Sequence, residues 1–216
     1  MNTNDLIENL ARGLEPVAPL RRPGMRAAMW LLGAVVYVGI LVVGMNAVKG
    51  DAAGVGAGFW VSQIAAIVVG LLASRAAFAS VVPGLPSHAR AWAVLAALVW
   101  LGTLVAASPW NFDWATVMGA NHEWVCVGFI VIGGTPLMVA LTVMLRRGAP
   151  LSPAATAALA VLAAAVMANV GACLALPHAN SAITVVWHGG VVLVLAAAAA
   201  LTARLVFGWS VPRWRR

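Results

Sequence analysis

The chain has 216 residues, of which 63% are hydrophobic and 9% charged, and its mean hydropathy is +0.96. A soluble domain carries about 25% charged and about 45–50% apolar residues. The composition therefore excludes an ordinary soluble protein. Because the apolar runs are long rather than alternating, it predicts an all-α integral membrane protein. The formal net charge is +7, but the basic residues lie at the ends of the apolar runs, which indicates membrane topology rather than direct nucleic-acid binding.

Residues 1–26 form a predicted water-exposed arm that holds three of the six acidic residues of the chain. Its apolar residues follow the spacing of one face of an α-helix: Leu6, Ile7, Leu10 and Leu14. Asp5 and Glu8 lie near the start of this helix, where the helix dipole favours negative charge. Gly13 and Pro16 end or loosen it, and Pro19 favours extended chain before the first apolar run.

A helix this short is marginal in water and is expected to fold against a surface. Its polar side is net acidic (Asp5, Glu8, Arg12 and Glu15 among others), whereas docking on anionic lipid requires a basic face. Both a membrane surface and a protein groove remain open, and the charge favours a basic protein partner.

Six apolar runs of about 20 residues are long enough to cross a bilayer core of about 30 Å. They lie at about 27–48, 55–74, 91–109, 124–145, 153–175 and 184–207. Residues 27–208 thus form a six-helix transmembrane domain, and 209–216 a basic tail. The second run contains Gln63, and Arg75 is expected to close it.

Lys and Arg predict the orientation of these spans. With the N-terminus inside, all 13 basic residues except Lys49 fall in the arm, in the cytoplasmic turns, at the cytoplasmic end of the sixth span or in the tail. By the positive-inside rule, both termini, and with them the arm and the tail, are cytoplasmic. Tryptophans near the span ends suit an interfacial aromatic belt: Trp30, Trp60, Trp92, Trp110, Trp114, Trp124 and Trp209. The alanine-rich fifth and sixth spans suit close helix packing.

Two cysteines are candidates for redox or metal chemistry. Cys126 lies near the outer start of the fourth span and Cys173 near the outer end of the fifth, so topology brings them to one depth. His122 precedes Cys126 by four residues, and His178 follows Cys173 by five. Thiol and imidazole suit soft or borderline metals, and thiols react with oxidants. The alternative is that each cysteine is a small apolar filler. No permanent cofactor is expected, although a transient metal ion at Cys126 and Cys173 fits.

Two other function classes stay open. A transporter or channel needs a polar path, for which the spans offer Ser62, Gln63, Ser74, Thr135, Thr142, Asn169 and His188. No span has an Asp, Glu or Lys at its centre, which disfavours proton or ion coupling. A haem or quinone electron-transfer protein would use paired histidines such as His122 and His178. No nucleotide-binding, zinc-protease or serine-hydrolase motif is present, so we expect no enzyme.

The arm segment "DLIENLARGLEPVAPLRRP" resembles the N-terminus of the NrsF family, bacterial six-helix anti-sigma factors. The resemblance continues in the Cys that heads the fourth span, in "RRGAPLSP" and in "LPHANSAITVVWHGG". It implies an inner-membrane, multi-pass regulator whose arm holds an extracytoplasmic-function sigma factor away from RNA polymerase. Asp5, Leu6, Ile7, Glu8, Leu10, Leu14 and Val17 would bind that partner.

The resemblance also implies that a cysteine pair senses metal or oxidative stress and releases the sigma factor. One feature departs from the family pattern, in which the second cysteine lies in the last external loop as His-Cys-Pro. Here that loop reads Leu-Pro-His178-Ala-Asn, and Cys173 lies earlier, inside the fifth span. A disulfide requires Cα atoms within roughly 7 Å, and the sequence leaves open whether the two thiols meet.

Overall fold

The computed structural model describes residues 2–12, 20–49, 56–82, 84, 88–106, 121–148, 150, 152–176 and 185–207. This part of the chain is helical and contains no strand, which confirms the all-α prediction. The α-helices are α1 (Thr3–Arg12), α2 (Pro23–Lys49), α3 (Ala57–Ala79), α4 (His88–Ala106), α6 (Asn121–Gly128), α7 (Gly134–Leu145), α8 (Pro153–Ala175) and α10 (Gly190–Phe207). Two π-helical segments, η1 (Phe129–Gly133) and η2 (Val185–Gly189), lie in the fourth and sixth spans.

Among the described residues, six helices are long and apolar enough to cross a membrane, as the sequence predicts. The fifth span, Pro153–Ala175, and the fourth, Trp124–Leu145, have the predicted bounds. The helix of the first span begins earlier than expected, at Pro23, because proline suits the first helical position. The prediction that Arg75 closes the second span is wrong: α3 continues to Ala79. Arg75 is exposed, and a long arginine side chain can reach the interface from within a helix.

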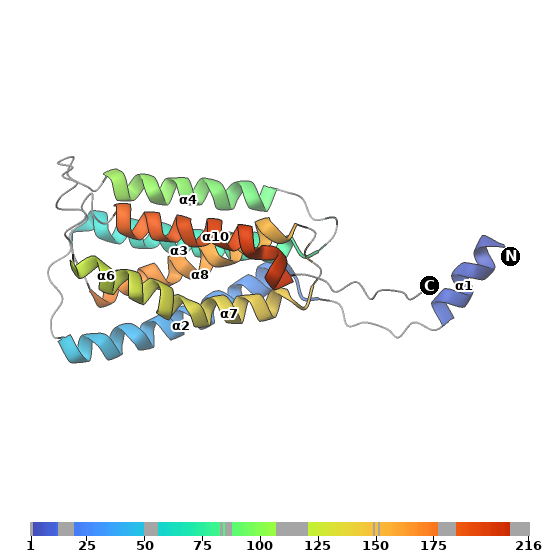
Figure 1. The fold of residues 1–216 in the computed structure, drawn as a ribbon, viewed down its shortest axis with the longest axis horizontal. Helices are drawn as coiled ribbons and strands as arrows, with labels where there is room; N and C mark the ends of the chain where they lie inside the picture. The colour runs from blue at the N-terminus through green and yellow to red at the C-terminus, as the bar shows by residue number, and fades with distance from the viewer. Residues whose placement is uncertain are drawn as a thin grey trace.

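Helix α8 is the centre of the bundle and packs against α2, α3, α7 and α10 (Figure 1). In the most apolar 18-residue stretch of its span 83% of residues are buried, against 17% in the corresponding stretches of the first, third and sixth spans, so α8 is the most buried helix of the bundle. Small residues let its neighbours approach closely, since a Cβ added at Gly70 of α3 would lie 3.0 Å from Met167 Sδ. A Cβ added at Gly134 of α7 would lie 3.2 Å from Ala168 Cβ. Alanine richness in this span therefore serves packing.

The sixth span contains six alanines, against eleven in the fifth, and it buries fewer of its residues. Ala197 and Ala198 of α10 are exposed, and only Val192, Ala203 and Phe207 of this helix are buried. Helix α10 nevertheless packs closely on α8, so the prediction of close packing holds for both alanine-rich spans, although α10 buries far fewer of its residues than α8.

Tryptophan positions also divide into two groups. Trp60, Trp92 and Trp124 are exposed near helix ends, in agreement with an aromatic belt. Trp30 is buried instead, and its indole Nε1 donates a hydrogen bond to the Leu137 carbonyl at 3.2 Å. Trp30 thus ties α2 to α7 and is a core residue, because the indole N–H finds a partner inside the bundle.

Candidate functional site

Helix α1 carries the described part of the predicted partner-binding arm. Figure 1 shows it beyond the end of the bundle at which α2 begins. Leu6 and Ile7 are 42% and 59% exposed, and Asp5 and Glu8 are exposed beside them. Arg12 Nη2 donates to Glu8 Oε1 at 2.7 Å across one helical turn. Two large apolar side chains on an isolated ten-residue helix present a surface that a partner could cover.

The remaining arm predictions fall on less completely described residues. Leu14 and Val17 lie outside the described residues, and for Leu10 only the helical backbone is described. The same holds for the histidines expected to flank the cysteines. His178 lies outside the described residues, and only the backbone of His122, on α6, is described.

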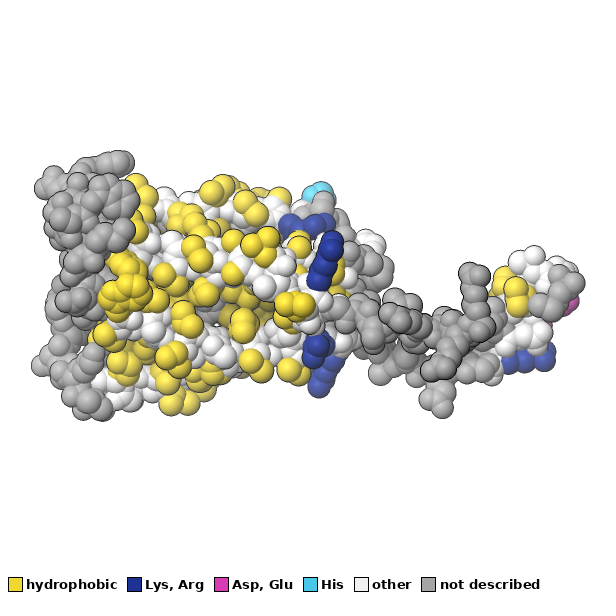
Figure 2. Space-filling view, viewed as in Figure 1, with side chains coloured by type: hydrophobic (Ala, Val, Ile, Leu, Met, Phe, Trp, Pro, Cys, Tyr) yellow, Lys and Arg dark blue, Asp and Glu magenta, His cyan; other side chains and the backbone are white. Residues whose placement is uncertain are grey.

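The bundle has two chemically different ends. The starts of α2, α4 and α8 and the ends of α3, α7 and α10 meet at one of them, here called the arginine end. Every bundle arginine that the structure describes lies there: Arg21, Arg22, Arg26, Arg75, Arg90, Arg146, Arg147 and Arg204. Figure 2 shows blue Lys and Arg side chains at the end of the bundle nearer α1, beside a largely hydrophobic face.

Arg26 fixes the point where the arm joins the bundle. The residue is 6% exposed, and one guanidinium nitrogen donates to the Met144 carbonyl at the end of α7. Its Cζ atom lies 4.4 Å above the ring of Phe78 in α3, a cation–π contact. Among the described residues its Nη1 atom has no hydrogen-bond partner. Arg26 therefore holds the start of α2 against α3 and α7.

The turn after α7 contains the "RRGAP" sequence. Arg146 Nη2 donates to the Val206 carbonyl of α10 at 3.0 Å, which links the ends of α7 and α10. A Cβ added at Gly148 would lie 2.8 Å from Val81 Cβ and 3.2 Å from the Val81 carbonyl oxygen. Any larger residue at position 148 would clash with Val81, which follows α3. The packing of this turn therefore requires the glycine of the motif.

Both cysteines lie at the opposite end of the bundle, here called the cysteine end, where α6 begins and α8 ends. They are buried, at 0% exposure for Cys126 and 4% for Cys173, and neither is in a disulfide. Cys126 packs with Ala175 and Leu176 at the end of α8. The two cysteines thus share one end of the molecule, while their immediate neighbours differ.

Cys173 belongs to a buried polar cluster that joins α8 to η2. Its Sγ atom lies 3.5 Å from Nδ1 of His188, and the same nitrogen lies 2.6 Å from Oδ1 of Asn169. All three side chains are buried. The amide oxygen can only accept, so Nδ1 donates to it. Asn169 therefore holds the imidazole beside the thiol, and we name these three residues the Asn-His-Cys cluster.

The π-helical segments lie beside this cluster. His188 is part of η2, and Phe129 of η1 lies against Gly171 of α8, where an added Cβ would lie 3.0 Å from the Phe129 ring. Trp187 of η2 stacks edge-on with Trp124 of α6 at a centroid distance of 4.8 Å. Such π-helical turns recur at functional sites, since they displace side chains from ordinary helical register.

In the sequence, His188 and Asn169 stand only among the scattered polar residues of the spans. One signal was available: Asn169 precedes Cys173 by four residues, which puts both on one face of α8. The meeting with His188 depends on the packing of α10 and η2 on α8, which periodicity does not reveal.

The described residues contain no group of three His, Cys, Asp or Glu side chains placed to hold a metal ion. The Asn-His-Cys cluster offers one thiol, one imidazole nitrogen and one amide oxygen. That donor set suits a soft or borderline ion only if a further ligand joins it.

One comparison with known proteins gives a match over nearly the whole chain. The family model NrsF, described as a negative regulator of sigma F, matches residues 10–209. No curated protein and no solved structure matches the chain.

Proposed function

This chain belongs to the NrsF family of negative regulators of sigma F, a regulator family rather than an enzyme class, and from this premise we propose its mechanism. It is a membrane-bound anti-sigma factor that holds an extracytoplasmic-function sigma factor through its N-terminal arm. A metal or oxidative signal at outward-facing cysteines releases the sigma factor. The observation that carries the proposal is the exposed pair Leu6 and Ile7 on a helix apart from the bundle.

The proposed orientation follows from the arginine end. Positively charged residues near span ends are retained on the cytoplasmic side, and all described bundle arginines lie at this one end. We therefore place the arginine end, the arm and the 209–216 tail in the cytoplasm of a bacterial cell. The cysteine end then faces the oxidising side of the inner membrane, where thiol chemistry is favoured.

The arm binds its partner by helix-in-groove recognition. Leu6, Ile7, Leu10, Leu14 and Val17 supply the apolar contact, while Asp5 and Glu8 face a basic surface on the sigma factor. Short helices gain most of their stability from such burial, so the arm folds fully on binding. Arg26 anchors the end of the arm to α3 and α7, so that changes in bundle packing reach the point where the arm leaves.

The proposed sensor consists of Cys126 and Cys173, with His122 and His178 as neighbouring donors. Support comes from the shared location of both thiols and from the His188 imidazole beside Cys173. The thiolate is the form that binds metals and reacts with oxidants, and the His188 imidazole lies within hydrogen-bonding distance of the Cys173 sulfur. Cys173 is part of α8, and Cys126 packs against the end of that helix. Because α2, α3, α7 and α10 all pack on α8, chemistry at either thiol alters the packing of the bundle.

A capture experiment tests the central claim. Full-length protein and a variant whose residues 2–20 are replaced by a Gly-Ser linker of equal length are purified from cells with the sigma factor. Mass spectrometry of the co-purifying proteins is expected to find the sigma factor only with the natural arm. Equal recovery from both chains would overturn sequestration by the arm.

The transporter alternative has less support. Most hydroxyls proposed for a polar path donate to carbonyls of their own helix, as Ser62 does to Phe59, Ser74 to Leu71 and Thr135 to Val131. Such bonds satisfy the hydroxyls without lining a path. The haem alternative would require His122 and His178 as axial ligands, and an absorption spectrum of the purified protein separates it from the regulator.

A further inference from the structure

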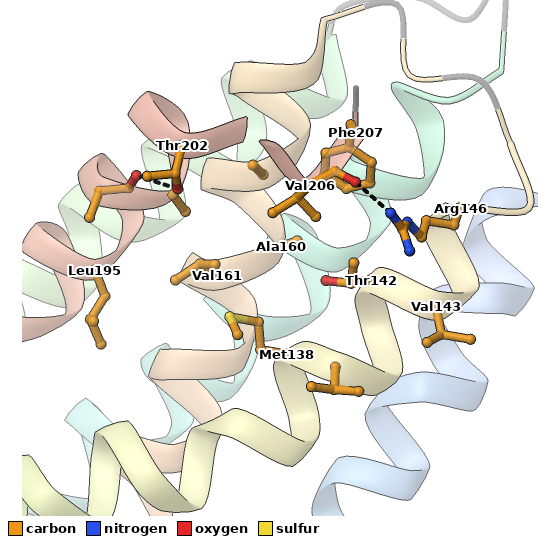
Figure 3. Close-up of a pocket in the computed structure, with 14 residues that line it drawn as sticks. Met138, Thr142, Val143, Arg146, Ala160, Val161, Leu195, Thr202, Val206 and Phe207 are labelled. Carbon is orange, nitrogen blue, oxygen red and sulfur yellow. Dashed lines mark hydrogen bonds between the residues drawn. The ribbon is translucent and has the colours of Figure 1, made fainter. Parts of the chain in front are cut away.

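A groove runs between α7 and α10, with α8 as its floor, at the arginine end of the bundle. It encloses about 450 Å³, which is within the range of about 300–1,000 Å³ typical of ligand sites. A smaller cavity of about 150 Å³ shares Met138, Val161 and Leu195 with it and extends it toward Ile130. Figure 3 shows these side chains along the groove, with Arg146 and Phe207 at its end. We call the two cavities together the α7–α10 groove.

The walls of the groove are almost wholly apolar. Alanine and valine side chains form its floor, including Ala157, Ala160 and Val161 of α8. Thr202 is one of its few polar residues, and its hydroxyl donates to the Ala198 carbonyl of the same helix at 2.9 Å. An occupant of these walls must therefore be largely hydrocarbon.

Arg146 is the one charged side chain among the residues that line the groove. It is exposed, and its hydrogen bond to the Val206 carbonyl uses one of the five N–H donors of a guanidinium. The described parts of α2, α3, α4, α7, α8 and α10 contain no acidic residue to pair with it. The negative charge that balances Arg146 must come from outside these helices.

We propose that the α7–α10 groove binds an acyl chain of an anionic phospholipid from the leaflet at the arginine end, and that Arg146 holds the phosphate. The groove extends from Arg146, directly after α7, along α7 to Val131 of η1, which is about 22 Å at the α-helical rise of about 1.5 Å per residue. One leaflet contributes about 15 Å of hydrocarbon, so a single chain fits along it. A guanidinium is suited to a phosphate because it donates two parallel hydrogen bonds.

A helix of a second copy is the rival occupant. The described membrane-spanning helices bring no carboxylate to this depth, so a second copy would leave Arg146 without a counter-charge. The phospholipid supplies both the apolar and the anionic part. Because it touches α7 and α10, each of which packs on α8, the lipid stabilises the arginine end independently of any sigma factor.

Native mass spectrometry of the full chain, ejected from nanodiscs of equal phosphatidylglycerol and phosphatidylcholine, tests the site. The natural protein is expected to retain phosphatidylglycerol in preference to phosphatidylcholine. Arg146→Gln should lower that retention about fivefold, since one cation near the surface contributes about 1 kcal/mol. Arg146→Lys should preserve most of it, and Arg90→Gln, which removes an equal charge outside the groove, should leave it unchanged.

A second pair of variants tests the hydrocarbon part. Ala198→Trp fills the groove from an exposed position, whereas Ala197→Trp places the same side chain next to it on α10 but outside the groove. Only Ala198→Trp should reduce lipid retention. Equal retention of both lipids, unaffected by Arg146→Gln, would overturn the site. Dimers that Ala198→Trp dissociates would overturn it in favour of a second copy.

Discussion

The two ends of the bundle handle polar groups in opposite ways. At the arginine end, every described bundle arginine except the buried Arg26 is exposed, and α2, α3, α4, α7, α8 and α10 contain no described acidic residue to pair with them. At the cysteine end, Asn169, Cys173 and His188 are buried and satisfy one another. Exposed, unbalanced charge is suited to external ligands, whereas an internally satisfied cluster specifies packing. Substitutions of exposed residues at the arginine end and on α1 should therefore change binding without changing the free energy of unfolding. Substitutions in the Asn-His-Cys cluster should change the free energy of unfolding without changing binding.

The largest effect is expected at α1. Replacing Leu6 and Ile7 by Asp puts charge on the proposed contact surface and should weaken sigma-factor capture about 100-fold or more, as for hot-spot residues. The temperature of unfolding should not change, because both side chains are exposed on a helix apart from the bundle. Titration of purified protein with sigma factor measures the affinity. Ala11→Asp on the same helix is the matched control, and equal weakening by it would contradict a specific contact.

The cysteine end should govern the response to signals. Cys173→Ser keeps a hydrogen-bonding group beside His188 but removes the thiol, and Cys126→Ser does the same at the start of the fourth span. The double variant with both substitutions should not induce a sigma-dependent reporter in response to a soft metal ion or an oxidant, because a serine hydroxyl forms neither a thiolate nor a disulfide. Sigma-factor capture without a signal should persist. Normal induction in the double variant would contradict the proposal that Cys126 and Cys173 sense the signal.

The Asn-His-Cys cluster should contribute to stability. His188→Ala removes the partner of Asn169 and leaves a buried amide unsatisfied, which should lower the free energy of unfolding by about 1–3 kcal/mol. Denaturant unfolding in detergent measures it. His88→Ala is the control, since His88 is exposed at the other end of the bundle and should have no effect. An equal change in the free energy of unfolding of both variants would mean that the hydrogen bond between Asn169 and His188 does not stabilise the cysteine end.

Much of this architecture is predictable from local sequence. Hydrophobic length and the distribution of Lys and Arg gave six spans and a single basic end, since each depends on residues close in the chain. The arm helix is likewise local, and α1 ends at Arg12, directly before Gly13. Composition does not indicate which of the two alanine-rich spans is buried at the centre of the bundle. The central position of α8 and the groove beside α10 depend on which helices pack together.

The candidate site was only partly predictable for the same reason. Cys126 and Cys173 could be placed at one end by counting spans, but their neighbours could not. Cys173 contacts His188, which is 15 residues away in sequence, through the packing of η2 on the end of the bundle. Trp30 gives a parallel case, because its hydrogen bond to Leu137 crosses from α2 to α7. Contacts between distant segments are set by tertiary packing, which one sequence does not display.

The smallest expected effect separates helix stability from partner contact within α1. Glu8→Gln and Arg12→Gln each remove the same exposed ion pair, whose loss costs an isolated helix about 0.3–0.5 kcal/mol, or about twofold. If Glu8 faces a basic surface on the sigma factor, Glu8→Gln should weaken capture by more than twofold. Arg12→Gln should then weaken it less or strengthen it, because it frees the carboxylate for the partner. Equal effects of the two variants would mean that Glu8 acts only through α1, and the acidic residues of the arm would lose their role in recognition.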